Sequence, residues 1–344
     1  MRLPILLSLL ASTSAFAIPE TRPEAALHLL ENRDSFFSQG SFRSSDGSKV
    51  SYTRYGAGTL GPKGCLVISP GQGEASLKYV ELAYDLLERG FAPIYAIDHR
   101  GQGFSDRPLP DREKNHVKFF SDYAKDFGLF LENIVLKNPA CQAQRINLIA
   151  HSMGSAVAAL YLESVGEHSP FKKAIFAAPM IKIHFPAGKS EKSVLWETWF
   201  ACNTPFGPSC SAYVPGKGGY DPQTPFEGNP LTHSETRFNL KKFVYQKWPE
   251  LRMGSPTVRW VRQSVLAGVR LRRTENAARI ATPILILQAS EDTIVDNSAQ
   301  NEFCGTVRNC RVEIINGAKH EIFMEKDFIR DPALSLSVNF FHQP

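Results

Sequence analysis

A serine, an aspartate and a histidine that follow separate β-prone runs could act together in this sequence. Ser152 stands in the segment AHSMG (150–154), directly after the apolar run 146–150. A nucleophilic serine can occupy the sharp turn between a strand and a helix if the residues two before and two after it are small. Ala150 and Gly154 meet this requirement, although the first position usually holds glycine. The alternative is an ordinary serine at the start of a helix.

The histidine that could serve as the base of this serine stands much later in the chain. For a serine on such a turn, the orienting carboxylate and then the histidine follow along the sequence. His320 comes soon after the β-prone run CRVEIING, in GAKHEIF, where a loop side chain would face the site. His342 lies third from the C-terminus, beyond a predicted helix. We therefore predict His320 as the base; the alternative is a surface loop histidine.

The orienting carboxylate is expected in the segment ILILQASEDTIVD (284–296). Glu291, Asp292 and Asp296 are the acidic residues of this segment. Asp292 belongs to the loop that directly follows the predicted strand. Asp296 stands where a helix begins and is suited to cap it. We predict Asp292 as the orienting acid, with Asp296 as the alternative.

Acyl transfer from an ester passes through an oxyanion, which backbone N–H groups can stabilise. One donor should be the residue after the nucleophile, Met153, and the other should come from the turn SPGQGEA (69–75). Within this turn Gln72 is the predicted donor, because Gly71 and Gly73 let the backbone approach closely. The alternative for this segment alone is a plain glycine turn.

A third glycine-rich turn, DHRGQGFSD (98–106), follows another predicted strand. We interpret Asp98 and Arg100 as residues that hold neighbouring loops, not as catalytic groups. His151 is adjacent to Ser152, but neighbouring residues of a chain point in different directions. We therefore expect His151 to shape the pocket instead of acting as the base.

Strands and helices alternate along most of the chain, which predicts an α/β fold with a doubly wound, mostly parallel sheet. A hairpin is expected around Asp46-Gly47, and an amphipathic helix is expected over 23–38. The carboxyl ends of parallel strands then gather the candidate residues at one edge of the sheet. Predicted strands cover 65–69, 92–98, 146–150, 172–180, 282–290 and 310–317, and predicted helices cover 76–90, 122–137, a segment from about 296 and the C-terminal end.

The alternation stops between residues 181 and 278, where Trp, Pro and Gly are frequent. Because a predicted strand follows this block, we interpret it as a helical cap inserted into the sheet domain. The predicted organisation is an α/β-hydrolase-like core in two parts, 18–180 and 279–344, with the cap over 181–278. The alternative is an independent domain.

Residues 1–17 have the pattern of a secretory signal peptide, with Arg2, an apolar run and the ending Ala15-Phe16-Ala17. The apolar run is about ten residues long, whereas a membrane-spanning helix needs roughly 20. We predict cleavage after Ala17 and export to a periplasmic or secreted location, with membrane association possible. The alternative is an N-terminal membrane anchor.

Export makes disulfide bonds expected among the cysteines, which number six. The sequence alone does not determine their connectivity. Short spacings favour Cys202 with Cys210 and Cys304 with Cys310, which leaves Cys65 and Cys141. The alternative, six reduced buried thiols, fits an exported protein poorly.

Composition and charge indicate neither a repeat protein nor a nucleic-acid-binding protein. The chain has 344 residues, of which 43% are hydrophobic and 21% charged, and no internal repeat. A net charge of +5 favours anionic lipid surfaces slightly, and no interleaving of basic and aromatic residues indicates nucleic-acid binding. We expect no metal and no cofactor.

Taken together, five motifs resemble the α/β-hydrolase superfamily, in the branch of monoacylglycerol lipases and lysophospholipases, and the bacterial lysophospholipases are most similar. The likeness spans roughly residues 41–343 and includes cap segments NPLTHSETRF and GSPTVRWVRQSVLAG. One departure is Pro70-Gly71, where monoacylglycerol lipases have His-Gly, and it favours the lysophospholipase side. The five motifs are AHSMG, SPGQGEA, DHRGQGFSD, QASEDTIVD and GAKHEIFME.

The resemblance implies a serine hydrolase that cleaves the acyl ester of a lysophospholipid. By the match of motifs, Ser152, Asp292 and His320 would form its triad, and Gln72 and Met153 its oxyanion donors. The cap, with Trp196, Trp199 and Phe206, could hold the acyl chain or touch a membrane surface; ordinary cap packing is the alternative for these aromatics.

Three other functions remain open at this point. A monoacylglycerol lipase or general carboxylesterase would use the same triad on another substrate. A peptidase of the proline iminopeptidase type would share the fold. A non-catalytic binding protein of this fold would usually lack one of the three triad residues, and all three positions are filled here.

Overall fold

The structure is a computed structural model that describes residues 17–31, 36–56, 61–143, 145–204 and 209–343. Its centre is a sheet of eight strands among these residues, in the order β1-β2-β4-β3-β5-β6-β7-β8. The predicted α/β architecture is thereby confirmed. The strands are β1 (Phe37–Arg43), β2 (Lys49–Tyr55), β3 (Cys65–Ser69), β4 (Ile94–Asp98), β5 (Ile146–His151), β6 (Phe171–Ala177), β7 (Ile284–Ala289) and β8 (Cys310–Ile315).

The sheet is mostly parallel, as the alternation of strands and helices predicts, with antiparallel pairing at one edge. β1 and β2 form the antiparallel hairpin around Asp46-Gly47, and β2 pairs antiparallel with β4. From β4 through β8 all pairings are parallel. The central strands β3, β4, β5 and β7 are buried along their whole length, as expected for sheet strands covered on both faces.

The predicted helix over 23–38 is too long. Helix α1 covers Pro23–Glu31, and Phe37 already belongs to strand β1, where it pairs with Tyr55. Aromatic residues favour a pleated, half-buried surface, and pairing with β2 buries Phe37 to 3% exposure. Tertiary pairing therefore overrides the helical periodicity at the end of this segment.

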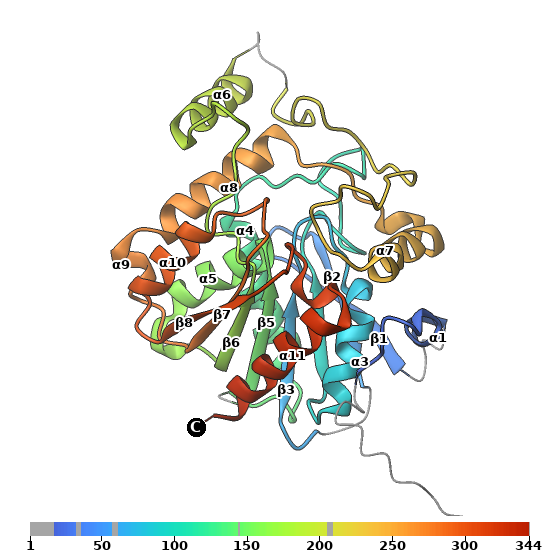
Figure 1. Cartoon of the computed structure of the whole chain (residues 1–344). Helices are drawn as coiled ribbons and strands as arrows, with labels where there is room; N and C mark the ends of the chain where they lie inside the picture. The colour runs from blue at the N-terminus through green and yellow to red at the C-terminus, as the bar shows by residue number, and fades with distance from the viewer. Residues whose placement is uncertain (1–16, 32–35, 57–60, 144, 205–208, 344) are drawn as a thin grey trace, which may run out of the picture.

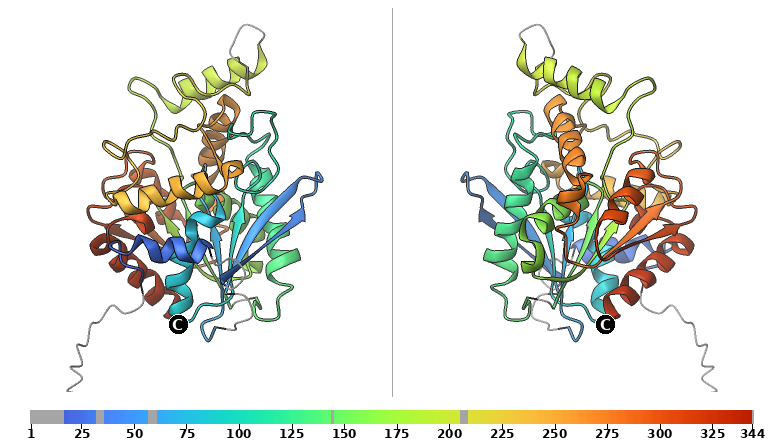
Figure 2. Two further views of the ribbon diagram at one scale, coloured as in Figure 1. Left: turned by 90° about the vertical axis from the view of Figure 1, so that its right-hand side faces the viewer. Right: turned by 90° about the vertical axis from the view of Figure 1, so that its left-hand side faces the viewer.

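Helices cover both faces of the sheet. Figure 2 shows α3 and α11 on one face and α4 on the other, and α4 packs against α5. The helices of the core are α3 (Val80–Glu88), α4 (Ser121–Phe130), α5 (Met153–Val165), α10 (Asn297–Thr306) and α11 (Asp327–His342). No helix among the described residues is long and apolar enough to cross a membrane.

The segment between β6 and β7 lies over the carboxyl ends of the strands (Figure 1). Serine and threonine side chains begin its longer helices: Ser190, Ser234 and Thr257 each accept a hydrogen bond from a backbone N–H of the first turn. Its helices are α6 (Glu191–Asn203), α7 (Glu235–Lys247), α8 (Val258–Leu271) and α9 (Thr274–Ala277).

Three disulfides link the cysteines in the pairs that their spacing favours. Cys65–Cys141 ties the start of β3 to the loop before β5, across 76 residues. The other two close short loops, Cys202–Cys210 after α6 and Cys304–Cys310 between α10 and β8. The long-range pair restricts the unfolded chain most, because it closes the largest loop.

Candidate active site

Ser152 lies on a sharp turn between β5 and α5, 6% exposed. Its backbone has φ 49° and ψ −115°, a region that residues with a Cβ seldom adopt. Gly154 allows the turn to pack: a Cβ there would lie 2.1 Å from the carbonyl oxygen of Ser69. Ala150, the departure from the usual glycine, is fully buried at the end of β5. The local geometry is therefore that of the predicted strand-to-helix turn.

The structure brings Ser152, His320 and Asp292 together from three different strands. His320 Nε2 lies 2.9 Å from Ser152 Oγ, and His320 Nδ1 lies 2.7 Å from Asp292 Oδ2. Ser152 follows β5, Asp292 follows β7, and His320 follows β8, so all three meet at the carboxyl edge of the sheet. This arrangement allows the histidine to take a proton from the serine while the carboxylate orients the imidazole.

Asp292 is held as an anion in this arrangement. Burial by itself would raise the pKa of its carboxyl group. The hydrogen bond and the charge of His320, together with the backbone N–H groups of Val295 and Ile294, outweigh burial and lower the pKa. The N–H groups of Ile294 and Val295 lie 2.8 and 3.0 Å from Asp292 Oδ1. An ionised Asp292 can stabilise a positive charge on His320.

The alternatives for the acid and the base lie elsewhere. Asp296 caps α10 by accepting hydrogen bonds from the N–H groups of Ser298 and Ala299, and it pairs with Lys182 at 2.7 Å. His342, at the end of α11, stacks on the ring of Phe91. Neither residue contacts Ser152.

The two predicted oxyanion donors have free N–H groups. Met153 is the first residue of α5, where a helix leaves its N–H groups without intrahelical acceptors. Among the described residues, the N–H groups of Met153 and Gln72 donate to no protein acceptor. Gln72 lies in the turn after β3, the strand beside β5. Unpaired N–H groups at such a position are suited to receive a developing negative charge.

Side chains from the third glycine-rich turn hold the turn that carries Gln72. Gln102 Oε1 accepts from Gly73 N at 2.9 Å, and Gln102 Nε2 donates to Gly71 O at 2.9 Å. Asp98 accepts from the N–H groups of Ser76 and Phe104, at 2.6 and 2.9 Å. Gln102 was not singled out from the sequence, although it lies in one of the motifs.

Arg100 holds a different set of loops, as the sequence predicts. Its guanidinium pairs with Asp126 at 2.6 Å and with Asp46 at 2.8 Å. These contacts connect β4, helix α4 and the β1–β2 hairpin. Arg100 contacts none of the three candidate catalytic residues.

A buried cluster of charged residues next to the site was not predicted. Lys78 lies between two carboxylates, 2.5 Å from Glu74 and 2.7 Å from Glu321. Glu74 also accepts from the backbone N–H of Gly71 at 2.5 Å and from the hydroxyl of Tyr79 at 2.6 Å. The sequence places two of its members, Glu74 and Glu321, inside the motifs SPGQGEA and GAKHEIFME, which could have indicated a position near the site.

His151 joins this cluster to the catalytic histidine. Its Nδ1 lies 3.4 Å from Glu74 Oε2 and its Nε2 lies 3.2 Å from the backbone oxygen of His320. Burial lowers the pKa of His151, but the negative charge of Glu74 and its hydrogen bond outweigh burial and raise it. His151 can therefore hold the turn 69–75 and the His320 loop at once. Both of its ring nitrogens contact these partners, so it is not placed to act as the base of Ser152.

The cap segment also holds the loop of His320. The N–H of Glu321 donates to the carbonyl oxygen of Leu231 at 2.8 Å, and Lys319 Nζ donates to Asn229 O at 2.9 Å. Asn229 and Leu231 belong to the cap motif NPLTHSETRF. The cap thus contributes directly to the placement of the base.

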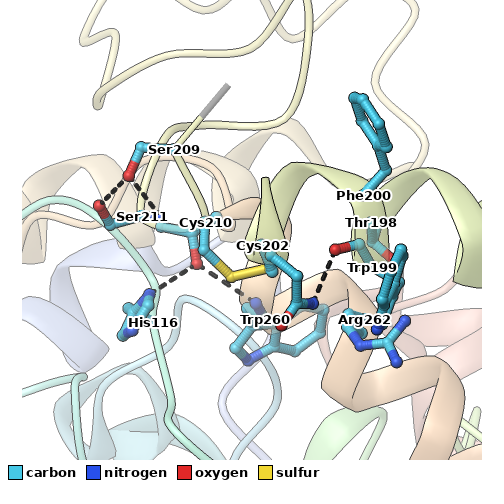
Figure 3. Close-up of a disulfide and its surroundings, with 12 residues drawn as sticks. His116, Thr198, Trp199, Phe200, Cys202, Ser209, Cys210, Ser211, Trp260 and Arg262 are labelled. Atoms are coloured by element: carbon cyan, nitrogen blue, oxygen red, sulfur yellow. Dashed lines mark hydrogen bonds between the residues drawn. A yellow bond between two sulfur atoms is a disulfide. The ribbon is translucent and has the colours of Figure 1, made fainter. Parts of the chain in front are cut away.

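An apolar surface lies on helix α6 at the end of the molecule farthest from the sheet (Figures 1 and 2). Trp196 is 64% exposed, Trp199 48% and Phe200 36%. Figure 3 shows that the Cys202–Cys210 disulfide ties the end of this helix to the following loop, above Trp260. Arg262 of α8 donates to Leu195 O at 2.6 Å and so anchors α6 from below.

Comparison with known proteins agrees with this geometry. The family described as "Serine aminopeptidase, S33" matches residues 61–327. Lysophospholipase L2 of Escherichia coli is 38% identical over 288 residues, which are 81% of this chain and 80% of that protein. The chain belongs to this α/β-hydrolase family. A second relative, probable lysophospholipase L2 of Haemophilus influenzae, is 34% identical over 80% of this chain and 82% of its own length.

Solved structures of α/β-hydrolases share the fold. A soluble variant of monoglyceride lipase from Saccharomyces cerevisiae aligns with a TM-score of 0.68 and 18% identity, over 89% of this chain and 94% of that chain. A carboxyl esterase from Bacillus coagulans aligns with a TM-score of 0.66 and 19% identity, over 89% and 97%. The family and the names of its members identify the chain as an esterase or hydrolase of the lysophospholipase type.

Proposed function

We propose that this α/β-hydrolase is a lysophospholipase that works through an acyl-enzyme formed on Ser152. The observation that carries the proposal is the continuous chain of hydrogen bonds from Ser152 Oγ through His320 to Asp292, at 2.9 and 2.7 Å. The relatives named lysophospholipase L2 support a one-chain phospholipid as the substrate.

The proposed reaction has two halves. His320 Nε2 takes the proton of Ser152, whose oxygen attacks the ester carbonyl carbon, and the N–H groups of Gln72 and Met153 stabilise the oxyanion. Collapse of this intermediate breaks the ester bond, and His320 returns the proton to the departing alcohol. Water, deprotonated by His320, then releases the fatty acid and restores Ser152.

The proposal includes contact between the cap and a lipid surface. Trp196 and Trp199 are exposed, which favours a lipid-facing role over the lining of a closed acyl tunnel. Aromatic rings are stable at the boundary between water and lipid, because one part is apolar and another polar. Phe206, the third aromatic residue predicted for this role, lies outside the described residues.

We also propose that the protein is exported, with a periplasmic or secreted destination. Three disulfides and the pattern of residues 1–17 support this location, since disulfides persist in oxidising compartments. Residues 1–16 lie outside the described part of the chain.

The decisive experiment compares fatty-acid release from lysophosphatidylethanolamine and from monoacylglycerol by purified protein. Ser152→Ala is the test variant, and Ser164→Ala, on the same helix α5, is the matched control. We expect faster release from the phospholipid, loss of release in Ser152→Ala and normal release in Ser164→Ala. Preference for monoacylglycerol would keep the mechanism and replace the substrate, whereas release by Ser152→Ala would overturn the site.

A fluorophosphonate reagent provides an independent test of the nucleophile. It reacts only with an activated serine, so we expect mass spectrometry to locate one adduct on Ser152 of the folded protein. Absence of labelling in folded protein would instead favour a binding protein of this fold without hydrolase activity.

A further inference from the structure

The backbone nitrogen of Ile18 lies against a buried carboxylate. Ile18 N is 2.9 Å from Asp85 Oδ1, across 67 residues of sequence. Ile18 is 6% exposed and Asp85 is fully buried. Residue 18 is also the position after the predicted cleavage site, where Ala15 and Ala17 supply the small residues that processing peptidases require.

Asp85 belongs to a largely buried group of charged side chains that contains more carboxylates than guanidinium groups. Asp85 Oδ2 pairs with Arg330 at 2.5 Å, and Arg330 also lies 3.6 Å from Glu81. Arg237 pairs with Glu81 at 2.8 Å and with Asp327 at 2.7 Å. Three carboxylates, of which Asp327 is 35% exposed, thus share two guanidinium groups, and one further positive charge would balance the group.

Asp331 and Arg89 add one charge of each sign to this group and leave the imbalance unchanged. Asp331 lies 3.6 Å from Arg330, and the positive charge of Arg89 acts on Asp85 from the same helix. The group therefore takes its members from α3, α7 and α11. The charged residues of the neighbouring helix α1, Glu24, His28 and Glu31, are exposed.

The surroundings of Asp85 disfavour the ionised form of its carboxyl group. Burial raises the pKa of its carboxyl group, and the ion pair with Arg330 and the N–H of Ile18 offset this only in part. Arg237 meanwhile donates to the carbonyl oxygen of Ile18 at 3.1 Å, so both backbone groups of Ile18 are bound. This arrangement holds residue 18 in place between three helices.

We propose that hydrolysis of the Ala17–Ile18 peptide bond creates an α-ammonium group on Ile18 that forms a buried ion pair with Asp85. Water supplies the hydroxyl that completes the carboxylate of Ala17 and the hydrogen that completes the amine of Ile18, which then binds a proton. Because Ile18 is buried in the folded protein, cleavage precedes folding of this segment. Processing then stabilises the fold in addition to releasing the leader, independently of the proposed enzymatic function.

The pH dependence of this ion pair has a defined sign. An unperturbed α-amino group has a pKa of about 7.7–8.0. Burial lowers that value, and in the proposed ion pair the carboxylate of Asp85 outweighs burial and raises it. A raised pKa in the folded state contributes stability that is complete below the unfolded value and is lost as pH rises through the folded value. The extra stability should therefore be present at neutral pH and absent in strong alkali.

The test compares two chains that differ by one residue. The first begins at Ile18, released from a fusion partner by cleavage directly before that residue. The second begins at Ala17, so that the nitrogen of Ile18 remains a neutral amide. We expect the Ile18 chain to have a Tm about 2–5 °C higher at pH 7, with the difference vanishing above about pH 10. Equal Tm values at pH 7, or a difference that persists in alkali, would overturn the proposal.

Asp85→Asn should remove the difference between the two chains, and Glu88→Gln, at an exposed position of the same helix, should preserve it. If Asp85→Asn does not fold, the chemical reactivity of the Ile18 α-amine tests whether the ion pair is present. We expect an amine-acylating reagent to modify Ile18 far more slowly in the folded chain than in urea, as measured by mass spectrometry. Rapid modification of the folded chain, or an exported protein whose intact mass begins elsewhere, would refute the ion pair.

Discussion

At the level of single residues, the neighbouring carboxylates Asp292 and Asp296 have different roles. Asp292 binds His320 Nδ1, whereas Asp296 caps α10 and pairs with Lys182. We predict that Asp292→Asn lowers kcat by about 10⁴-fold, because the imidazole would adopt the wrong tautomer. Asp296→Asn should change kcat less than about threefold, since asparagine also caps helices. Ester hydrolysis at saturating substrate measures both, and similar losses would contradict the assignment.

The small residues around Ser152 are not equivalent. A Cβ on Gly154 would lie 2.1 Å from Ser69 O, a backbone atom that cannot move aside without shifting β3. We predict that Gly154→Ala costs more than about 3 kcal/mol of unfolding free energy and abolishes activity.

Ala150→Gly is the matched control, because it restores the usual glycine of this turn. It should keep activity within a few-fold and cost about 0.5–1 kcal/mol, the expected penalty for glycine in a strand. Urea unfolding and ester hydrolysis distinguish the two variants. A fully active Gly154→Ala protein would show that the turn tolerates a larger residue.

At the level of elements, the long disulfide contributes more than the short ones. Cys65–Cys141 closes a loop of 76 residues and Cys304–Cys310 a loop of 6. Loop-closure entropy predicts losses of about 4.5 kcal/mol for the double alanine variant of the first pair and about 2 kcal/mol for the second. Urea unfolding measures both losses. An equal loss from both pairs would mean that packing, not chain entropy, determines their effect.

The charged cluster between the turn after β3 and the loop after β8 predicts acid sensitivity. Burial raises the pKa of Glu74, but Lys78 and His151 outweigh it and hold the pKa well below its usual value. A lowered folded-state pKa contributes stability that is present above the unfolded value of about 4.3 and is lost as pH falls through the folded value. We therefore expect Tm to fall between about pH 5 and pH 3.

Glu74→Gln should reduce the steepness of this decline, although its Tm at pH 7 should be lower because Lys78 loses a partner. Glu167→Gln, at an exposed position, is the control and should keep the wild-type slope. Thermal unfolding from pH 3 to pH 7 gives both slopes. An unchanged slope in Glu74→Gln would show that other carboxylates control acid unfolding.

At the level of the whole molecule, helix α6 lies far from the sheet and presents aromatic rings to solvent. We predict that Trp196→Ser with Trp199→Ser weakens binding to lysophospholipid-containing vesicles at least about tenfold, because two rings leave the interface. Hydrolysis of a soluble short-chain ester should be unaffected, since these rings lie on the outer part of the cap.

Phe328→Ser provides the control for this prediction. Phe328 is 74% exposed on helix α11, which belongs to the sheet domain and not to the cap. Vesicle flotation should detect no change in this variant. Equal loss from Phe328→Ser would mean that vesicle binding follows overall hydrophobicity and not the position of α6.

Much of this protein follows from local patterns in the sequence. The buried strands, the glycine turns and the short cysteine loops depend on neighbouring residues, so periodicity and spacing predict them. The same patterns favoured Ser152, Asp292 and His320 as partners, because residues that follow parallel strands meet at one edge of a sheet. The distances of 2.9 and 2.7 Å between them required the complete fold.

Contacts between distant segments depended on tertiary structure alone. Phe37 joins β1, against its helical periodicity, because Tyr55 of β2 pairs with it. The charges of Glu74 and Glu321 look like ordinary surface charges in the sequence, and only burial around Lys78 makes them a cluster. The contact between Ile18 and Asp85 likewise joins residues that carry no shared pattern. Local sequence determines which elements form, whereas packing determines which buried polar groups must find partners.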